Sequence, residues 1–193
     1  MEQSVKFAEN VMLIDASFLG FVIRDLKRHF ERKLGRNLKN IMLQDLFEFM
    51  ALDAGIQPGA GCVQVFLIYE EEGAVLPFCH PSDLKKELND TAFDCQLGKF
   101  EFNSFQPAGL ATSDDLYLES LHLLVRSADV KKLLVVSFNE RYGKNVIDVL
   151  SKVQGKNVTQ LRMDAPESPV SFHWDFLAYP VMKALGIRGD ELA

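Results

Sequence analysis

The sequence predicts an α/β fold, a three-layer sandwich in which helices cover both faces of a mainly parallel central sheet. Two observations predict this class. Segments with strand patterning alternate with segments of helical periodicity, and three of the strand segments are apolar along their length, as strands buried on both faces are. These segments are VMLID, VQVFLIY and LLVVS, at residues 11–15, 63–69 and 133–137. We expect one domain over residues 1–193.

The first half of the chain predicts two helices between two strands. The run that ends in Asp15 is the expected first strand. Residues 18–34 then carry apolar side chains at spacings of three and four, and Gly35 stands where a helix C-cap glycine belongs. Residues 43–53 repeat the helical pattern, and residues 63–69 are β-branched and aromatic, which is typical of a central strand.

The second half predicts a further series of alternating elements. In chain order we expect a short polar helix, a half-buried strand near the sheet edge, a helix, a strand, a helix, a strand and a terminal helix. They cover residues 83–89, 99–105, 113–125, 133–137, 143–153, 157–163 and about 172–186. Ser113, which precedes two acids, is the expected N-cap of its helix, and Pro180 is expected to kink the terminal helix.

The composition excludes several protein classes. No apolar run approaches the roughly 18 to 20 residues of a membrane span, and the first ten residues carry charges where a signal peptide is apolar. The three cysteines lack the spacing of a metal or disulfide motif, so we expect a cytoplasmic protein in a reducing compartment. No GxGxxG or GxxxxGK[ST] motif exists, which excludes dinucleotide and P-loop sites, and the four scattered histidines are expected to be structural.

Charge is unevenly distributed along the chain. The formal net charge of −6 disfavours attraction of the whole molecule to nucleic acid. Residues 24–39, however, hold seven basic residues against two acids. Arg24, Arg28 and Arg32 are therefore candidate contacts for an anionic partner. The alternative is a solvated helix face whose long side chains cover the core.

Polar residues follow several of the predicted strands. In a parallel sheet, ligands bind at the carboxyl ends of the strands, so we expect Asp15, residues 69–72 and residues 137–140 to converge there. Asp15 is either a ligand for a metal or phosphate, or a simple helix cap, and Ser17 is an alternative cap.

Two further groups are candidates for the same edge. Asp114 and Asp115 open a helix, where they are either partners of the helix dipole or carboxylate ligands for a hard cation. The segment SFNERY, residues 137–142, offers the side chains of Ser137, Asn139, Glu140 and Arg141. These side chains suit a phosphate or a metal-bound water, or they are turn and surface residues.

The layout resembles the PIN-like nuclease superfamily, and within it the NYN branch. VMLIDASFL looks like the family's first strand, whose leading aspartate matches Asp15. The family then has an acid near a helix start, an apolar strand, S-G-D-x-D-F, a helix and a G-K-x-V strand. Here the order is Asp114 or Asp115, LLVVS, SFNERY, a helix and GKNV at residues 155–158. The resemblance covers about residues 11–163 and implies a Rossmann-like topology.

The resemblance implies a ribonuclease that binds Mg²⁺ or Mn²⁺. The implied metal ligands are Asp15, Asp114 and Asp115, and Glu140 joins them as a catalytic candidate. The residues implied to contact the substrate are Ser17, Arg24, Arg28, Arg32, Ser137, Asn139 and Arg141.

The chain departs from the family motif at two charged positions. The two aspartates of S-G-D-x-D-F fall on Asn139 and Arg141, so two negative charges are lost and one positive charge is gained. We therefore expect a PIN/NYN-like domain with an impaired acidic metal site that acts as a binding or scaffolding module for RNA or a protein partner. The alternative is an active Mg²⁺- or Mn²⁺-dependent ribonuclease that uses Asp15, Asp114 or Asp115, and Glu140.

Overall fold

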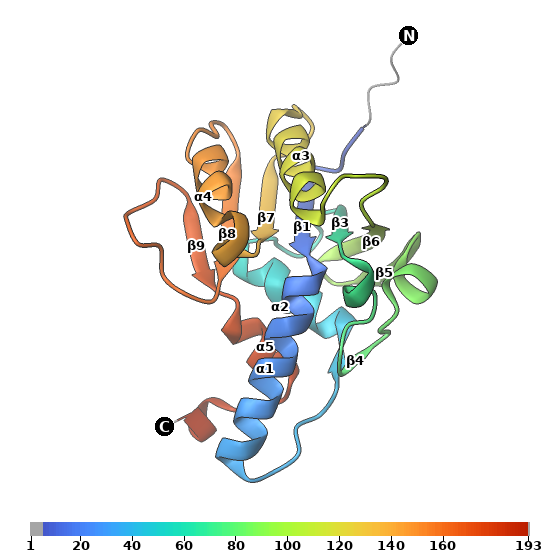
Figure 1. The fold of residues 1–193 in the computed structure, drawn as a ribbon, viewed down its shortest axis with the longest axis vertical. Coiled ribbons are helices and arrows are strands. Elements are labelled where there is room, and N and C mark those ends of the chain that lie inside the picture. The colour runs from blue at the N-terminus through green and yellow to red at the C-terminus, as the bar shows by residue number, and fades with distance from the viewer. Residues whose placement is uncertain (1–5, 193) are drawn as a thin grey trace.

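A seven-stranded sheet forms the centre of the computed structural model, which describes residues 6–192 (Figure 1). The strand order is β5-β6-β3-β1-β7-β8-β9, and every neighbouring pair in this sheet is parallel except β5 and β6. The strands are β1 (Asn10–Asp15), β3 (Cys62–Ile68), β5 (Thr91–Cys95), β6 (Gly98–Phe105), β7 (Lys132–Val136), β8 (Asn157–Arg162) and β9 (His173–Phe176). A separate parallel pair is formed by β2 (Ile41–Met42) and β4 (Cys79–His80).

Helices cover both faces of the sheet, which confirms the predicted three-layer α/β sandwich (Figure 1). One face packs against α1 (Ala16–Leu34), α2 (Leu43–Asp53) and α5 (Ala178–Ala184), and the other against α3 (Ser113–Arg126) and α4 (Asn139–Leu150). Successive β1 residues serve the two layers in turn, because strand side chains alternate in direction. Met12 faces the α1 layer and Leu13 the α3 layer, so the whole strand is buried.

Helix α1 follows directly from its sequence pattern. Its buried residues include Val22, Ile23, Leu26 and Phe30, which form the expected apolar stripe. Gly35 ends the helix in the left-handed conformation, at φ 62°, as the C-cap position predicted. This helix carries the basic segment away from the sheet edge at which it begins.

Three expected helix starts or types differ from the structure. The N-cap of α3 is Thr112, whose hydroxyl accepts from the Asp115 amide at 3.1 Å, so Ser113 is the first residue of the helix instead. Helix α4 begins at Asn139, before the predicted start, and bends at Tyr142, whose φ of −134° is not helical. The short polar segment is one π-helical turn, η2 (Leu84–Leu88).

The prediction of one terminal helix over residues 172–186 is wrong in its first half. Residues 173–176 form β9, which pairs in parallel with β8 and extends the sheet. Pro180 then lies in the first turn of α5, where its missing N–H removes no helical hydrogen bond, so it kinks nothing. Strands β2, β4 and β5 were not predicted. Of the helices within residues 6–192, none combines the length and hydropathy needed to cross a bilayer.

Candidate binding site at the carboxyl edge of the sheet

The carboxyl ends of three central strands bring the candidate residues to one edge. Asp15 ends β1, Glu70 comes shortly after β3, and Ser137 directly follows β7. The first turns of α1, α3 and α4 lie at the same edge, because these helices follow β1, β6 and β7 in the chain and begin near the carboxyl ends of those strands. The expected convergence of Asp15 with the segments after β3 and β7 is therefore present.

Asp15 is the N-cap of α1, and both of its oxygens are engaged. Its Oδ1 accepts from the Phe18 amide at 2.9 Å, and its Oδ2 accepts from the Tyr142 hydroxyl at 2.6 Å. The side chain is buried, and this burial raises the pKa of Asp15, although the two hydrogen bonds and the charge of Arg141 oppose the rise. Burial also raises the pKa of Tyr142, which keeps its hydroxyl a donor. Each oxygen of Asp15 thus already accepts one hydrogen bond from within the fold.

Arg141 bridges two carboxylates beside Asp15. Its Nη1 lies 2.9 Å from Glu70 Oε1, and its Nη2 lies 2.8 Å from Asp114 Oδ1. Its Nε donates to Asp114 Oδ2 at 3.2 Å, whereas the enclosed Oδ1 is held by charge without an aligned hydrogen bond. Ser113 donates to Glu70 Oε1 at 2.7 Å, and the bonds from Ser113 and Arg141 lower the pKa of Glu70. The single positive charge of the guanidinium therefore offsets one of the two negative charges that Glu70 and Asp114 bring to this edge.

The acids implied as metal ligands do not form a set that fits a divalent cation. The Asp115 carboxylate accepts hydrogen bonds from the amide and the hydroxyl of Thr112, at 3.1 and 2.7 Å. Glu140 lines a separate cleft, and Asp114 is bonded to Arg141. Within residues 6–192, no group of three or more His, Cys, Asp or Glu side chains lies close enough together to hold a metal ion. A cation would also meet the positive charge of Arg141.

The remaining polar candidates satisfy one another. Ser17 accepts from the Glu70 amide at 3.0 Å. Ser137 donates to Asn139 Oδ1 at 2.9 Å, and both accept from Gln160 Nε2, at 3.0 and 3.2 Å. Gln160 Oε1 in turn accepts from Arg162 Nη1 at 2.9 Å. Ser17, Ser137 and Asn139 thus stabilise the edge itself.

The sequence reasoning gave no role to four residues of this edge: Glu70, Tyr142, Gln160 and Arg162. Two of them belong to segments that the sequence places at this edge, Glu70 in residues 69–72 and Tyr142 in SFNERY, whereas Gln160 and Arg162 do not. A signal existed for Gln160 and Arg162, because they are polar residues within a predicted strand. Both are buried in β8. Buried polar residues of this kind require hydrogen-bond partners within the fold.

Two clefts lie on either side of an aromatic pair at this edge. The rings of Phe18 and Phe138 stack with centroids 4.9 Å apart. The Arg141 cleft, of about 330 Å³, is lined by residues that include Ser17, Phe21, Arg24, Glu70, Phe138 and Arg141. The Arg162 cleft, of about 150 Å³, is lined by residues that include Phe18, Val22, Phe138, Asn139, Glu140 and Arg162.

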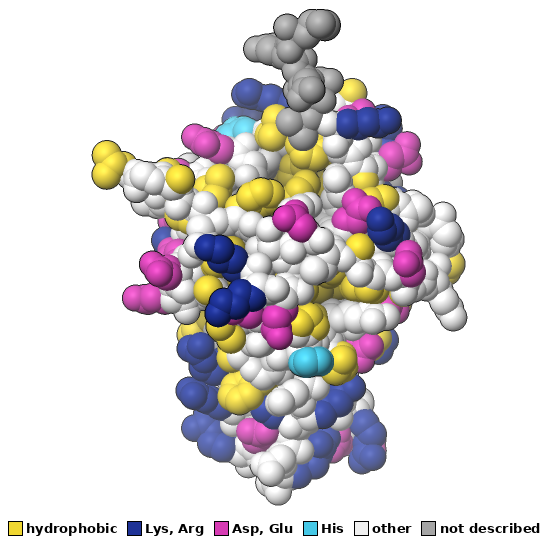
Figure 2. Space-filling view, turned by 90° about the vertical axis from the view of Figure 1, so that its right-hand side faces the viewer, with side chains coloured by type: hydrophobic (Ala, Val, Ile, Leu, Met, Phe, Trp, Pro, Cys, Tyr) yellow, Lys and Arg dark blue, Asp and Glu magenta, His cyan; other side chains and the backbone are white. Residues whose placement is uncertain are grey.

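A stripe of exposed arginines leads away from the Arg141 cleft along α1. Arg24 lines the cleft, and Arg28 and Arg32 follow at intervals of one helical turn, so the three share a face. Among the described residues, none of the three has an ion-pair partner. Figure 2 shows basic side chains gathered over the lower part of the molecule, where α1 ends in Figure 1.

Two other basic residues of the segment are not free. Lys27 is buried, lies 2.7 Å from Glu31 and donates to the carbonyl of Leu38. Arg36 is paired with Glu191 at 2.8 Å. The basic face is therefore narrower than the sequence indicates.

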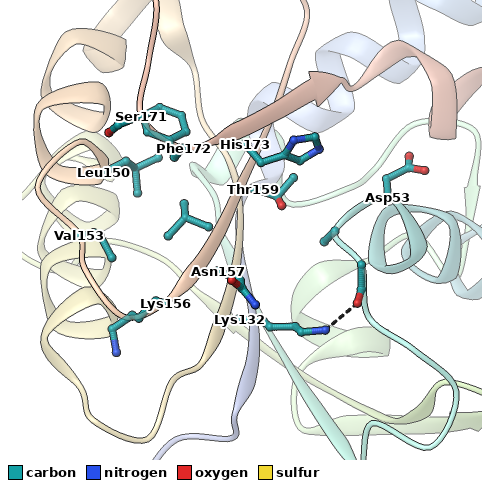
Figure 3. Close-up of a pocket in the computed structure, with 13 residues that line it drawn as sticks. Asp53, Lys132, Leu150, Val153, Lys156, Asn157, Thr159, Ser171, Phe172 and His173 are labelled. Atoms are coloured by element: carbon teal, nitrogen blue, oxygen red, sulfur yellow. Dashed lines mark hydrogen bonds between the residues drawn. The ribbon is translucent and has the colours of Figure 1, made fainter.

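A third cavity, of about 470 Å³, lies at the opposite edge of the sheet, beside the amino ends of β7 and β8 (Figure 3). Its lysines are engaged by the backbone. Lys132 donates to the carbonyl of Gly55 at 2.6 Å, and Lys156 donates to the carbonyls of Ser127 and Val130. These hydrogen bonds tie loops together at the amino ends of the strands.

The chain belongs to a family whose function is unknown. Residues 4–192 match the model described as "Family of unknown function (DUF6621)". No curated protein and no solved structure matches the sequence.

Proposed function

We propose that this member of the DUF6621 family is a PIN/NYN-like domain that binds RNA and does not cleave it. One observation carries the proposal: Arg141 is bonded to Glu70 and Asp114 where the resemblance implies a metal ion. A guanidinium in this position supplies the positive charge that the acids would otherwise take from Mg²⁺ or Mn²⁺. It cannot supply an activated water, which is the metal's chemical contribution in this class of nuclease.

The stripe of Arg24, Arg28 and Arg32 supports RNA as the partner. Its members lie about 6 Å apart along the helix axis, at 1.5 Å per residue, and bear unpaired charges that suit a phosphate backbone. Phe21 lies one turn before Arg24, lines the same cleft and is 57% exposed. An exposed aromatic ring beside arginines is the combination that binds single-stranded nucleic acid by stacking and charge. Three cysteines without a disulfide support a cytoplasmic setting.

Binding of a labelled single-stranded RNA, followed by fluorescence anisotropy over a range of salt concentrations, tests the proposal. We expect affinity to fall steeply with salt. The double variant Arg28→Glu/Arg32→Glu should bind at least about tenfold more weakly and reduce the salt slope by about 1.4, since each phosphate contact in a single strand contributes about 0.7. The matched control is Arg126→Glu, which reverses an exposed charge on α3 and should leave affinity nearly unchanged.

Two outcomes would overturn this reading. Binding that does not depend on salt or on Arg28 and Arg32 would exclude the stripe as the RNA contact. Robust Mn²⁺-dependent cleavage of the RNA, abolished by Asp15→Asn, would instead establish the alternative ribonuclease, with Glu140 completing its site.

A further inference from the structure

The Arg162 cleft contains a buried cation without a carboxylate partner. Arg162 is only 6% exposed, yet no described acid lies within ion-pair distance of it. Its Nε donates to the carbonyl of Asp164 at 3.0 Å, and its Nη1 donates to Gln160 Oε1 at 2.9 Å. Burial lowers the pKa of Arg162, and the charge of Asp164 offsets this only in part. A buried charge of this kind is costly unless something neutralises it.

The free part of the guanidinium is accessible from the cleft. Nη2 makes no hydrogen bond with a described residue. It is not sealed off either, because the one fully enclosed side-chain nitrogen or oxygen without a partner in residues 6–192 is Asp114 Oδ1. Since Arg162 lines the cleft, its unused donors are available to a molecule inside it.

The start of α4 adds donors at the same place. Asn139 and Glu140 are the first residues of this 12-residue helix and both line the cleft. Their amides have no hydrogen-bond partner among the described residues, and Phe138, the N-cap, contributes no side-chain cap. An arginine fork beside free amides at a helix N-terminus is a binding arrangement for a carboxylate or phosphate.

The rim of the cleft selects between these two anions. Asp25, Glu140 and Asp164 line it with exposed carboxylates, which repel a dianion and attract an ammonium group. The walls are apolar and include Val22, Phe138 and Met163. The cleft therefore combines a cationic floor, an anionic rim and an apolar wall within about 150 Å³.

We propose that the Arg162 cleft binds a free α-amino acid with an apolar side chain. Its carboxylate bonds to Arg162 and the first amides of α4, its ammonium group lies at the acidic rim, and its side chain packs against the apolar wall. This binding site uses neither Arg141 nor the arginine stripe, although Phe21 lines both clefts.

Isothermal titration calorimetry with the full chain tests the site. L-Leucine is the first probe, and two analogues remove one charge each: 4-methylpentanoate lacks the ammonium group and 3-methylbutylamine lacks the carboxylate. We expect leucine to bind and each analogue to bind at least about tenfold more weakly, which corresponds to about 1.4 kcal/mol. L-Methionine and L-phenylalanine define the tolerated side chain, and inorganic phosphate should not bind.

Matched variants locate the binding. Arg162→Gln should abolish it, and Glu140→Gln, which changes an exposed side chain and keeps the fold, should weaken it at least about threefold, a factor worth roughly 0.6 kcal/mol. Glu119→Gln, an exposed acid on α3, is the control and should leave affinity unchanged. The proposal is overturned if none of the three amino acids binds at millimolar concentration, if phosphate or a nucleoside monophosphate binds in their place, or if Glu140→Gln leaves leucine affinity unchanged.

Discussion

Two arginines stand on opposite sides of the Phe18–Phe138 stack and differ in how their charge is met. Arg141 is 39% exposed, yet two carboxylates hold it at 2.9 and 2.8 Å. Arg162 is almost entirely buried and has carbonyl partners in place of carboxylates. Access to solvent therefore does not decide which arginine is available to a ligand. The exposed one is neutralised within the fold, and the buried one retains an unmatched charge.

The acids around the two arginines also differ in whether they are bonded. Glu70 and Asp114 are bonded to Arg141, and Asp15 beside them is bonded to Tyr142 and the Phe18 amide. On the other side, the carboxylates line a rim without touching Arg162. The first group forms a closed network, and the second leaves room for a molecule between opposite charges.

The largest effect is expected from breaking the closed network at Tyr142. Tyr142→Phe removes the hydroxyl that donates to buried Asp15 at 2.6 Å, and the carboxylate keeps only the Phe18 amide. Hydrogen bonds to charged groups contribute about 1.5–3 kcal/mol, so unfolding in urea should show a loss of about 2–3 kcal/mol. The control is Tyr179→Phe, because Tyr179 is 55% exposed. A loss equal to that of the control would contradict the network.

A smaller effect is expected when the bridging Arg141 is replaced by an acid. Arg141→Asp removes the bridging charge and places a third carboxylate beside Glu70 and Asp114. We expect the variant to bind Mn²⁺, which the natural chain should not bind detectably. A dissociation constant near 0.1 mM would stabilise the variant by about 1.4 kcal/mol in 1 mM MnCl₂, a rise in Tm of about 3–6 °C.

Thermal unfolding with and without the metal measures this gain. Arg126→Asp, which introduces the same charge on α3, should show no Mn²⁺-dependent shift. If the natural chain shifts as much as the Arg141→Asp variant, Arg141 does not exclude the metal.

The sequence predicts the elements that depend on local periodicity and does not predict those that depend on contacts between distant residues. The order of the main elements, the apolar β1 and the full span of α2 follow from periodicity within one segment. Strand β9 does not, because four residues become a strand only where the edge of β8 accepts them. Capping of a helix by Asp15 was one of two interpretations of the sequence. The hydrogen bond between Asp15 and Tyr142 was not predicted, because it joins residues 127 positions apart and depends on the bend in α4.

The same limit applies to the two arginines. The family motif aligns Arg141 with an aspartate, but it does not predict that Glu70 and Asp114 pair with this arginine, because the three residues are far apart in the sequence. Arg162 was part of a predicted strand, and its position under a cleft depends on how α1 and α4 pack around β8. Charge pairing across elements is a property of the assembled fold.

The smallest effect, a difference in pH dependence, separates the acids within the closed network. Burial raises the pKa of Asp15 above its ordinary value of 3.8, so the folded chain holds this proton over a pH range in which the unfolded chain releases it. The stability that Asp15 contributes is therefore present at low pH and is lost as pH rises through the raised pKa. The pKa of Glu70 is lowered below 4.5 by Ser113 and Arg141, so its contribution is present above that value and is lost as pH falls through the lowered pKa.

Removing either acid should tilt the stability curve in opposite directions. Asp15→Asn eliminates the component that declines with rising pH, so its stability relative to the natural chain should improve from about pH 3 to pH 7. Glu70→Gln eliminates the component that grows with pH, and its relative stability should worsen over the same range, by less than about 1 kcal/mol because the ion pair is partly exposed. Urea unfolding at several pH values measures both slopes. Parallel curves for the two variants would contradict the opposite pKa shifts of Asp15 and Glu70, because only opposite shifts produce opposite slopes.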